Sequence, residues 1–283
     1  MPTRTTIIIP CYNEAHRLGE SLAQLREHLE RSAALNVDVI VVDDGSSDGT
    51  AAVAARALKG WDFAQVVRLP WNQGKGGALK VGVAAATGDN IVLMDADLSG
   101  DLAYLRIQIE GLEETDIVVG SRMAAGSRVT YASGTRRMMS RLFNVIACTA
   151  TGVNASDTQC GYKAMRTPVA KLLFHLIETR GFAHDVELLL LADLLGYSVS
   201  ERGVGWEEGS GSSVSVLRDP WRMLRDVAKT RRFVAQLRSQ HGAEHLAACA
   251  VASKSLLLVD SGSGWLEPVV DLRPGQSRVV EVS

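Results

Sequence analysis

Ile91-Val92-Leu93-Met94-Asp95-Ala96-Asp97 is an apolar run that ends on two carboxylates one residue apart. Four apolar residues, two of them β-branched, are typical of a strand buried on both faces of a sheet. Residues i and i+2 of an extended chain point the same way, so Asp95 and Asp97 should face one side of the strand end. Because adjacent carboxylates repel one another unless a cation lies between them, the pair predicts a site for Mg²⁺ or Mn²⁺ and phosphate oxygens. The alternative is a solvated turn, in which Asp is common.

The bulk composition is that of a globular protein with enough length for a large core. The chain has 283 residues, of which 46% are hydrophobic and 22% charged, and its formal net charge is −2. A dominant basic surface is missing, so we expect no nucleic acid partner. The four cysteines are scattered and form no C-x-x-C pair, which favours reduced thiols and a cytoplasmic location.

Neither a signal peptide nor a transmembrane span is expected. The first strand-like run, 5–9, begins almost at the first residue. The most apolar late run, 246–259, contains Lys254 and is shorter than the roughly 20 residues that a span needs. We therefore expect any membrane contact to be peripheral.

Up to about Arg122, short apolar runs alternate with helical patterns. The strand-like runs are 5–9, 37–42, 64–69, 90–94 and 116–119. The helical stretches between them are 15–31, 48–59, 76–86 and 101–113. This alternation predicts an α/β fold with a mostly parallel, Rossmann-like sheet flanked by helices. Ligands of such sheets bind outside the carboxyl ends of the strands.

Polar clusters follow all five strand-like runs at those carboxyl ends. They are Pro10-Cys11-Tyr12-Asn13-Glu14, Asp43-Asp44-Gly45-Ser46, Asn72-Gln73-Gly74-Lys75-Gly76-Gly77, Asp95-Ala96-Asp97 and Gly120-Ser121-Arg122. Each cluster alone can be a turn, a helix cap or a glycine-rich loop. Glycines beside a lysine at a helix start also suit a phosphate. Five clusters at successive strand ends indicate a single functional site.

These five motifs, in this order, resemble those of the family 2 inverting glycosyltransferases with the GT-A fold, and the similarity covers about residues 1–235. The resemblance implies a nucleotide-sugar donor. Its nucleotide would be held by Pro10, Tyr12, Asn13, Glu14, Asp43 and Asp44. Lys75 would lie near the donor phosphate, and Asp95, Ala96 and Asp97 would meet the diphosphate and its metal ion.

Later segments resemble those of dolichyl-phosphate β-glucosyltransferases and their bacterial polyprenyl-phosphate relatives. They are Asp157-Thr158-Gln159-Cys160-Gly161-Tyr162-Lys163, Gly181-Phe182-Ala183-His184-Asp185-Val186-Glu187-Leu188 and the stretch from Trp206 to Ser212. This resemblance implies transfer of glucose from UDP-glucose to a polyprenyl-phosphate acceptor. Two positions depart from related patterns: Ser99 replaces a metal-proximal Gln of many phosphomannose synthases, and Ser213 replaces a common Lys. The alternatives are GDP-mannose as donor, a soluble acceptor, or a non-catalytic nucleotide-binding subunit.

The chemistry of such a transfer assigns three catalytic candidates, Asp97, Arg122 and Asp157. A metal ion on Asp95 and Asp97, assisted by Lys75 and Arg122, would neutralise the leaving diphosphate. A lipid monophosphate has a second pKa of about 6, so it is already largely anionic at neutral pH and needs little general-base help. A sugar hydroxyl would need a strong base. Asp157 is the candidate for that base or for a group that orients the acceptor, or it caps the following turn.

The expected acceptor-binding residues include both acidic and basic side chains. They are Arg122, Arg136, Arg137, Gln159, Asp185 and Glu187. Arg136 and Arg137 belong to a basic segment that predicts a helix start and could bind an acceptor phosphate, or they are solvated. Asp185 and Glu187 could instead be surface charges on a helix.

We divide the chain into a catalytic domain, 1–217, a basic amphipathic helix, 218–240, and a tail, 241–283. Within 218–238, seven basic residues against two aspartates leave a net charge of +5. Arg218, Arg222, Arg225, Lys229 and Arg232 stack on one ridge. Such a helix suits an anionic membrane surface, which predicts a peripheral protein on the cytoplasmic membrane face, or it docks on the catalytic domain. The tail should contain a helix, 241–254, and three short strands, 255–260, 265–270 and 277–282.

Overall fold

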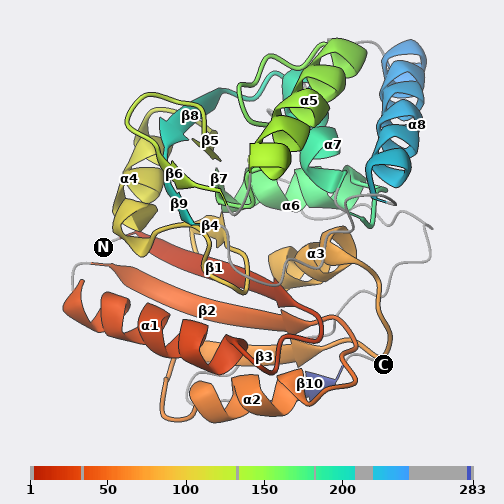
Figure 1. Ribbon diagram of the computed structural model, residues 1–283. Helices are drawn as coiled ribbons and strands as arrows, with labels where there is room; N and C mark the ends of the chain where they lie inside the picture. Colours follow the sequence, from red (N-terminus) through yellow and green to blue (C-terminus); the bar gives the residue numbers. More distant parts are fainter. Residues whose placement is uncertain are drawn as a thin grey trace.

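The computed structural model describes residues 3–32, 35–131, 134–181, 183–207, 219–241 and 279–281. Within these ranges, eight strands form one sheet in the order β10-β3-β2-β1-β4-β7-β5-β8 (Figure 1). The strands are β1 (Arg4–Cys11), β2 (Asn36–Asp43), β3 (Ala64–Arg68), β4 (Asn90–Leu93), β5 (Ile117–Ser121), β7 (Lys163–Arg166), β8 (Val199–Gly203) and β10 (Val279–Glu281). All neighbours are parallel except those of β7, which runs antiparallel to β4 and β5. The mostly parallel sheet is confirmed.

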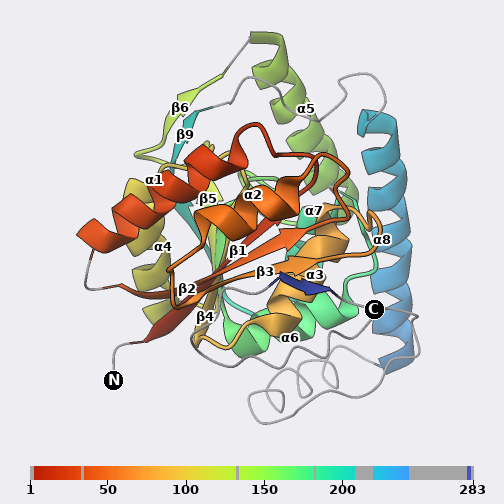
Figure 2. The same cartoon turned by 90° about the horizontal axis from the view of Figure 1, so that it is seen from below.

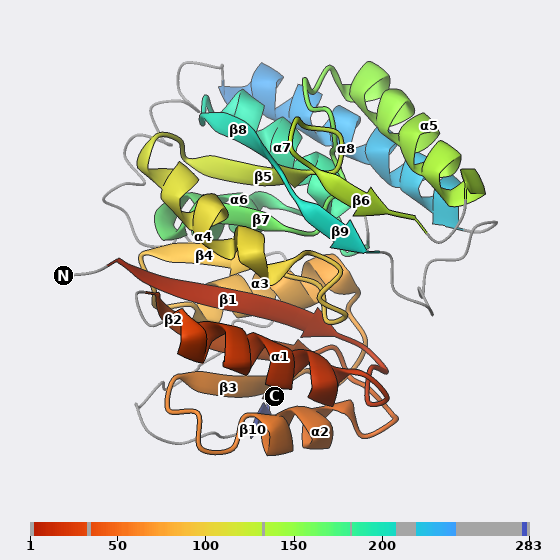
Figure 3. The same cartoon turned by 60° about the vertical axis from the view of Figure 1, so that its left-hand side comes forward.

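Helices cover both faces of the sheet, as Figure 3 shows. On one face lie α1 (Leu18–Arg31), α2 (Thr50–Ala57) and α4 (Leu105–Glu110), and on the other lie α3 (Lys75–Ala85), α6 (Thr167–Leu176) and α7 (His184–Leu194). Strand side chains alternate between the two cores: Ile91 and Leu93 belong to one, Val92 and Met94 to the other. The run that ends at Asp95 is therefore buried on both faces, as expected.

A third group of helices packs beyond α7. Here α5 (Gly134–Thr151) and α8 (Asp219–His241) lie side by side (Figure 2). Ala147 of α5, Val186 of α7 and Val227 of α8 form the core between these helices. One face of α8 is therefore docked on the rest of the protein, while Arg225 and Lys229 are exposed. The division at residues 217 and 240 stays a prediction.

Several elements differ from the sequence prediction. The polar strand β7 was not expected, because Lys163 and Arg166 interrupt its apolar pattern. A small second sheet pairs β6 (Arg128–Thr130) with β9 (Gly205–Glu207), and neither was expected. The helix expected at 101–113 is broken into η1 (Leu102–Tyr104), α4 and η2 (Gly111–Glu113).

In the tail, β10 overlaps the strand expected at 277–282 and pairs with β3. The helix and the two strands expected at 241–254, 255–260 and 265–270 lie almost wholly outside the described residues. Within the described ranges, none of the helices combines the length and the hydropathy needed to cross a bilayer.

Candidate active site

Asp43 and Asp44, at the end of β2, hold the loops that follow β2 and β3: Asp43 bonds within the first loop, and Asp44 bonds to the second. Asp43 is fully buried, and its Oδ1 accepts a hydrogen bond of 3.1 Å from the backbone N–H of Ser46. The carboxylate of Asp44 accepts hydrogen bonds from the backbone N–H groups of Gln73, at 2.7 Å, and Gly74, at 2.8 Å. Burial raises the pKa of Asp44 to about 6. The glycine-rich loop is thereby held beside the end of β2.

The loop after β1 is held against the same edge. The backbone N–H of Asn13 donates to Ser46 Oγ at 2.9 Å, and that of Glu14 donates to Thr50 Oγ1 at 2.9 Å. Asn13 has a φ of 55°, a left-handed conformation that asparagine tolerates better than most residues. Pro10 is half-buried, and Tyr12 is exposed at this edge. All six residues predicted to bind the nucleotide therefore lie at the carboxyl ends of β1 and β2.

The carboxylates of Asp95 and Asp97 each meet a cation. Lys75, the first residue of α3, places its Nζ 2.6 Å from Asp95 Oδ1. Arg17 places Nη1 3.5 Å from Asp97 Oδ2 and also pairs with Glu14. Burial opposes the charge of Lys75, but Asp95, Asp185 and Asp97 raise its pKa, so the ammonium stays charged. The structure brings the predicted aspartates and Lys75 into one cluster.

The donor set of this cluster fits a hard divalent cation. The side chains of Asp95 and Asp97 are 25% and 21% exposed, so solvent reaches both carboxylates. Among the described residues, no group of three or more His, Cys, Asp or Glu side chains could hold a metal ion. The protein would therefore supply two carboxylates, and phosphate oxygens and water the remaining ligands, as is common for Mg²⁺.

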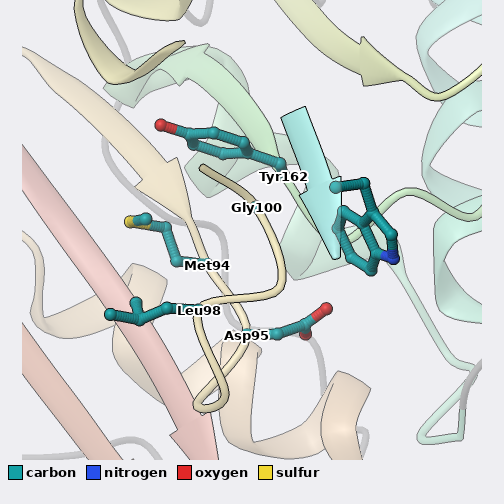
Figure 4. A pocket seen from close by; sticks show the side chains of 6 residues that line it. Met94, Asp95, Leu98, Gly100 and Tyr162 are labelled. Carbon is teal, nitrogen blue, oxygen red and sulfur yellow. The ribbon is translucent and has the colours of Figure 1, made fainter. Parts of the chain in front are cut away.

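The loop 157–163 passes directly against Asp95. A methyl group on Gly161 would overlap the Asp95 carboxylate, so only glycine permits this approach. A small hollow lies beside it, lined by Met94, Asp95, Leu98, Gly100, Tyr162 and Trp206. Figure 4 shows the side chains of Asp95 and Leu98 pointing to opposite sides of the turn, with the Tyr162 ring next to Gly100.

Arg122 and Asp157 form a buried ion pair. Arg122 donates from Nε to Asp157 Oδ2 at 2.7 Å and from Nη2 to Oδ1 at 2.9 Å. Oδ1 also accepts from the backbone N–H of Gln159 at 3.2 Å. Burial opposes the ionisation of Asp157, but its bonds to Arg122 bring its pKa below the usual value. The guanidinium carbon of Arg122 lies 5.2 Å from the centre of the Trp206 ring. Asp157 therefore holds the edge of the Arg122 guanidinium, and the Trp206 ring packs against its face.

The acidic side chains on α7 are buried, so the interpretation as surface charges is wrong. Asp185 Oδ1 pairs with Lys163 Nζ at 2.6 Å, and Lys163 is itself fully buried. The carboxylate of Glu187 accepts from the backbone N–H groups of Glu178, at 3.1 Å, and Thr179, at 2.9 Å. That loop packs on the start of α3, where Gly76 N–H donates to Arg180 O at 2.8 Å. Unpaired carboxylates are costly to bury, which is why both are bonded.

The two basic candidates on α5 are less informative. Arg137 is exposed and lies 5.9 Å from the centre of the Tyr131 ring. The side chain of Arg136 lies outside the described part of the chain. Arg17 and Trp206 were not among the predicted site residues. Arg17 could have been found from its spacing of three residues from Glu14, which is that of a helical ion pair. Trp206 could have been found from the stretch 206–212, which resembles the dolichyl-phosphate β-glucosyltransferases.

This fold and this arrangement of charges at the strand ends define a GT-A glycosyltransferase. A model of the family "Glycosyl transferase family 2" matches residues 6–174. The chain belongs to this family, and it is a glycosyltransferase.

Its curated relatives include dolichyl-phosphate beta-glucosyltransferases. The chain is 33% identical to that of Drosophila melanogaster over 78% of its own length and 72% of the relative's. It is 31% identical to that of Homo sapiens over 75% and 70%.

Solved structures support the fold. Glucosyl-3-phosphoglycerate synthase of Mycobacterium tuberculosis superposes with a TM-score of 0.59 at 19% identity, covering 84% of this chain and 80% of the other. The mannosyltransferase PcManGT of Pyrobaculum calidifontis, in complex with GDP-Man and Mn²⁺, superposes with a TM-score of 0.53 at 20% identity, covering 91% and 77%. At these identities the likeness concerns the fold, and the predicted GT-A fold is confirmed.

Proposed function

We propose that this glycosyltransferase moves glucose from UDP-glucose to a polyprenyl or dolichyl monophosphate at the cytoplasmic face of a membrane. The names of its curated relatives specify dolichyl phosphate and a β-glucosyl group. The geometric observation that carries the proposal is the Arg122–Asp157 pair. With both oxygens bonded and its pKa lowered, Asp157 is a poor general base. A phosphate acceptor suits such a site, because its oxygen is already anionic at neutral pH.

On the donor side, the loops that contain Tyr12, Asp43 and Asp44 would bind the nucleotide. Asp95 and Asp97 would hold Mg²⁺ or Mn²⁺, which when bound supplies Lewis-acid stabilisation of the leaving diphosphate. Lys75 adds a positive charge whose position is set by its 2.6 Å contact with Asp95. A preformed charge of this kind favours the transition state, since no reorganisation is needed as the diphosphate leaves.

On the acceptor side, Arg122 is the group best placed to bind a phosphate. Its guanidinium is held by Asp157 and Trp206, so little side-chain freedom remains to be lost on binding. We assign Asp157 to orienting Arg122. Asp185 and Glu187 would act indirectly, by holding the loops behind Lys75.

Membrane contact would come from α5 and α8 together. On α8, Arg225, Lys229 and Arg232 are exposed. On α5, Met138, Leu142 and Val145 are more than half exposed and lie on one helical face. An apolar stripe beside basic side chains suits an anionic bilayer surface, where the apolar groups enter the headgroup region and the charges meet lipid phosphates.

The test is transfer of labelled sugar into lipid. The protein is incubated with polyprenyl phosphate, Mg²⁺ or Mn²⁺, and labelled UDP-glucose or GDP-mannose, and the lipid phase is extracted. We expect label from UDP-glucose only. Asp97→Ala should reduce transfer at least about 100-fold, because the diphosphate loses its metal ligand, while circular dichroism stays that of the wild type. Asp62→Ala is the control, since Asp62 is exposed near the amino end of β3.

The outcomes separate the parts of the proposal. If only GDP-mannose labels the lipid phase, the donor is GDP-mannose and not UDP-glucose. If neither donor labels the lipid phase, the lipid acceptor is wrong, and soluble acceptors become the alternative. Equal turnover by the Asp97→Ala variant would remove the metal role. If the protein binds nucleotide but transfers sugar to no acceptor, the non-catalytic alternative holds.

A further inference from the structure

Trp206 contacts both halves of the site. Its side chain lines the hollow beside Asp95, and its ring lies 5.2 Å from the guanidinium carbon of Arg122. On either side of Trp206, β9 is bonded to the turn that follows Asp97: Glu207 N–H donates to Ser99 O, and Asp101 N–H donates to Gly205 O, both at 2.9 Å. The indole is therefore held at the junction between the proposed diphosphate and acceptor positions, and it remains partly exposed.

The hollow around Trp206 is largely apolar and rigid. Tyr162 is buried, and a Cβ on Gly100 would lie only 2.9 Å from its ring (Figure 4). Met94 is also buried, and Leu98 is half-buried. Apart from Asp95, the lining offers no side-chain charge. The indole of Trp206, which lines this hollow with Asp95 and is partly exposed, is thus better suited to a C–H face than to a phosphate.

A transferred hexose must lie where these groups meet. In the proposed function, its anomeric carbon would start on the diphosphate beside Asp95 and end on an acceptor phosphate beside Arg122. A hexopyranose has an apolar face of C–H groups, and the negative face of an aromatic ring attracts their positive edges. Positive charge that develops on the sugar as its bond to the diphosphate breaks is also attracted by an indole face.

We propose that the face of the Trp206 indole that Arg122 does not cover is the platform on which the transferred hexose lies, so that Trp206 is a specificity-determining residue. The identity of the sugar rests on the proposed function, whereas the role of the indole needs no particular acceptor. In the proposed site, the nucleotide would be bound by residues at the ends of β1 and β2, and the diphosphate by the charged groups Asp95, Asp97 and Lys75 and the metal ion rather than by the uncharged indole. Trp206 therefore contributes to the affinity for the nucleotide sugar and contributes nothing to the affinity for the free nucleotide.

The test compares two dissociation constants in each variant, without any acceptor. Titration calorimetry with Mn²⁺ present measures the binding of UDP-glucose and UDP, and of GDP-mannose and GDP. Trp206→Ala should raise the dissociation constant of the nucleotide sugar about 10-fold. The dissociation constant of the free nucleotide should stay within about twofold of the wild-type value. Trp206→Phe, which keeps an aromatic face, should stay within about threefold for both. The matched control is Trp61→Ala, because Trp61 also stacks on an arginine, Arg26, at the distant end of α2.

Trp206→Leu repeats the measurement with an apolar side chain of larger volume, should the alanine variant fold poorly. Intrinsic fluorescence gives a second readout: UDP-glucose should quench the wild type more than UDP does, and Trp206→Phe should abolish that difference. Equal weakening of sugar and nucleotide, or no weakening of either, would overturn the proposal. Sugar-selective binding without any labelled lipid would leave Trp206 in place and contradict only the acceptor of the proposed function.

Discussion

Arg122 and Asp157 are joined by two parallel hydrogen bonds, Nε to Oδ2 at 2.7 Å and Nη2 to Oδ1 at 2.9 Å. They are 35 residues apart in the sequence, and the pair lies at the carboxyl end of β5. A bidentate pair fixes the plane of the guanidinium as well as its position. The carboxylate that sequence reasoning offered as a base or an orienting group is, in this geometry, the support of an arginine.

The first prediction concerns the pH dependence of transfer. Since its bonds to Arg122 hold the pKa of Asp157 below the usual value of a carboxyl group, the carboxylate stays ionised near neutral pH and adds no titration there. The rate should instead rise as the acceptor phosphate loses its second proton, near pH 6. Asp157→Asn should reduce kcat/KM about 100-fold at every pH, because Arg122 is misplaced. The rise of the rate near pH 6, which is the acid limb of the profile, should remain. If that limb disappears in Asp157→Asn, Asp157 is a general base after all.

The second prediction tests the close approach of the loop 157–163 to Asp95. Gly161→Ala should displace the Asp95 carboxylate, because the added methyl group overlaps it. We expect at least about a 10-fold loss of transfer and weaker Mn²⁺ binding in the presence of UDP, measured by calorimetry. Gly134→Ala is the control, since nothing lies within 4 Å of its added methyl group. Wild-type Mn²⁺ affinity in Gly161→Ala would show that the carboxylate is not a ligand held in this position.

The third prediction concerns the buried pair of Lys163 and Asp185. Lys163→Met removes the cation that lies 2.6 Å from the buried Asp185 carboxylate, so the free energy of unfolding in urea should fall by about 3–5 kcal/mol. The double variant Lys163→Met/Asp185→Leu replaces both charges and should recover most of that loss. A double variant as unstable as the single one would show that packing, and not charge, sets the cost.

The same pair has an acid signature. Burial opposes the ionisation of Asp185, but His184 and Lys163 lower its pKa from 3.8 to about 2. Its contribution to stability is present above the unfolded pKa and is lost as the pH falls through about 2. Asp185→Asn should therefore lack the part of the acid destabilisation that the wild type shows between pH 4 and 2, measured by urea unfolding at each pH.

The fourth prediction concerns membrane binding. Replacing three exposed basic residues of α8 by Gln should weaken binding to anionic vesicles about 100-fold, since each contributes roughly 1 kcal/mol near the surface. These residues are Arg225, Lys229 and Arg232. Raising the salt concentration should also weaken the binding of the wild type to anionic vesicles. Vesicle co-sedimentation measures both effects.

The control replaces three exposed basic residues on the other side of the protein by Gln, and it should bind vesicles like the wild type. They are Arg31, Lys59 and Arg106. Undiminished binding of the α8 variant would leave that helix as a docked element with a solvated basic face. Met138→Ser/Val145→Ser should in turn weaken binding with little salt dependence, because the contribution of α5 is apolar.

Some of this protein could be predicted from local pattern. Apolar runs such as Val92 and its neighbours identify buried strands, and the carboxyl ends of parallel strands meet at one edge whatever the loops between them. For that reason the cluster of Asp95, Asp97 and Lys75 could be predicted from the sequence. The elements that pattern missed are short or polar: β7 contains Lys163 and Arg166, and its place between β4 and β5 depends on pairing with strands far away in sequence.

The class of fold, the edge of the sheet at which polar residues gather and the types of those residues follow from hydrophobic periodicity and strand polarity, which are properties of the local sequence. Which charges neutralise one another depends on tertiary contacts. Asp185 was predicted either to bind the acceptor or to be a surface charge, and it pairs with Lys163 in the core. Asp157 was predicted as a base, as a group that orients the acceptor or as a cap, and Arg122 occupies both its oxygens. A pKa depends on burial and on the nearest opposite charge, and both are set by contacts between segments that local sequence does not specify.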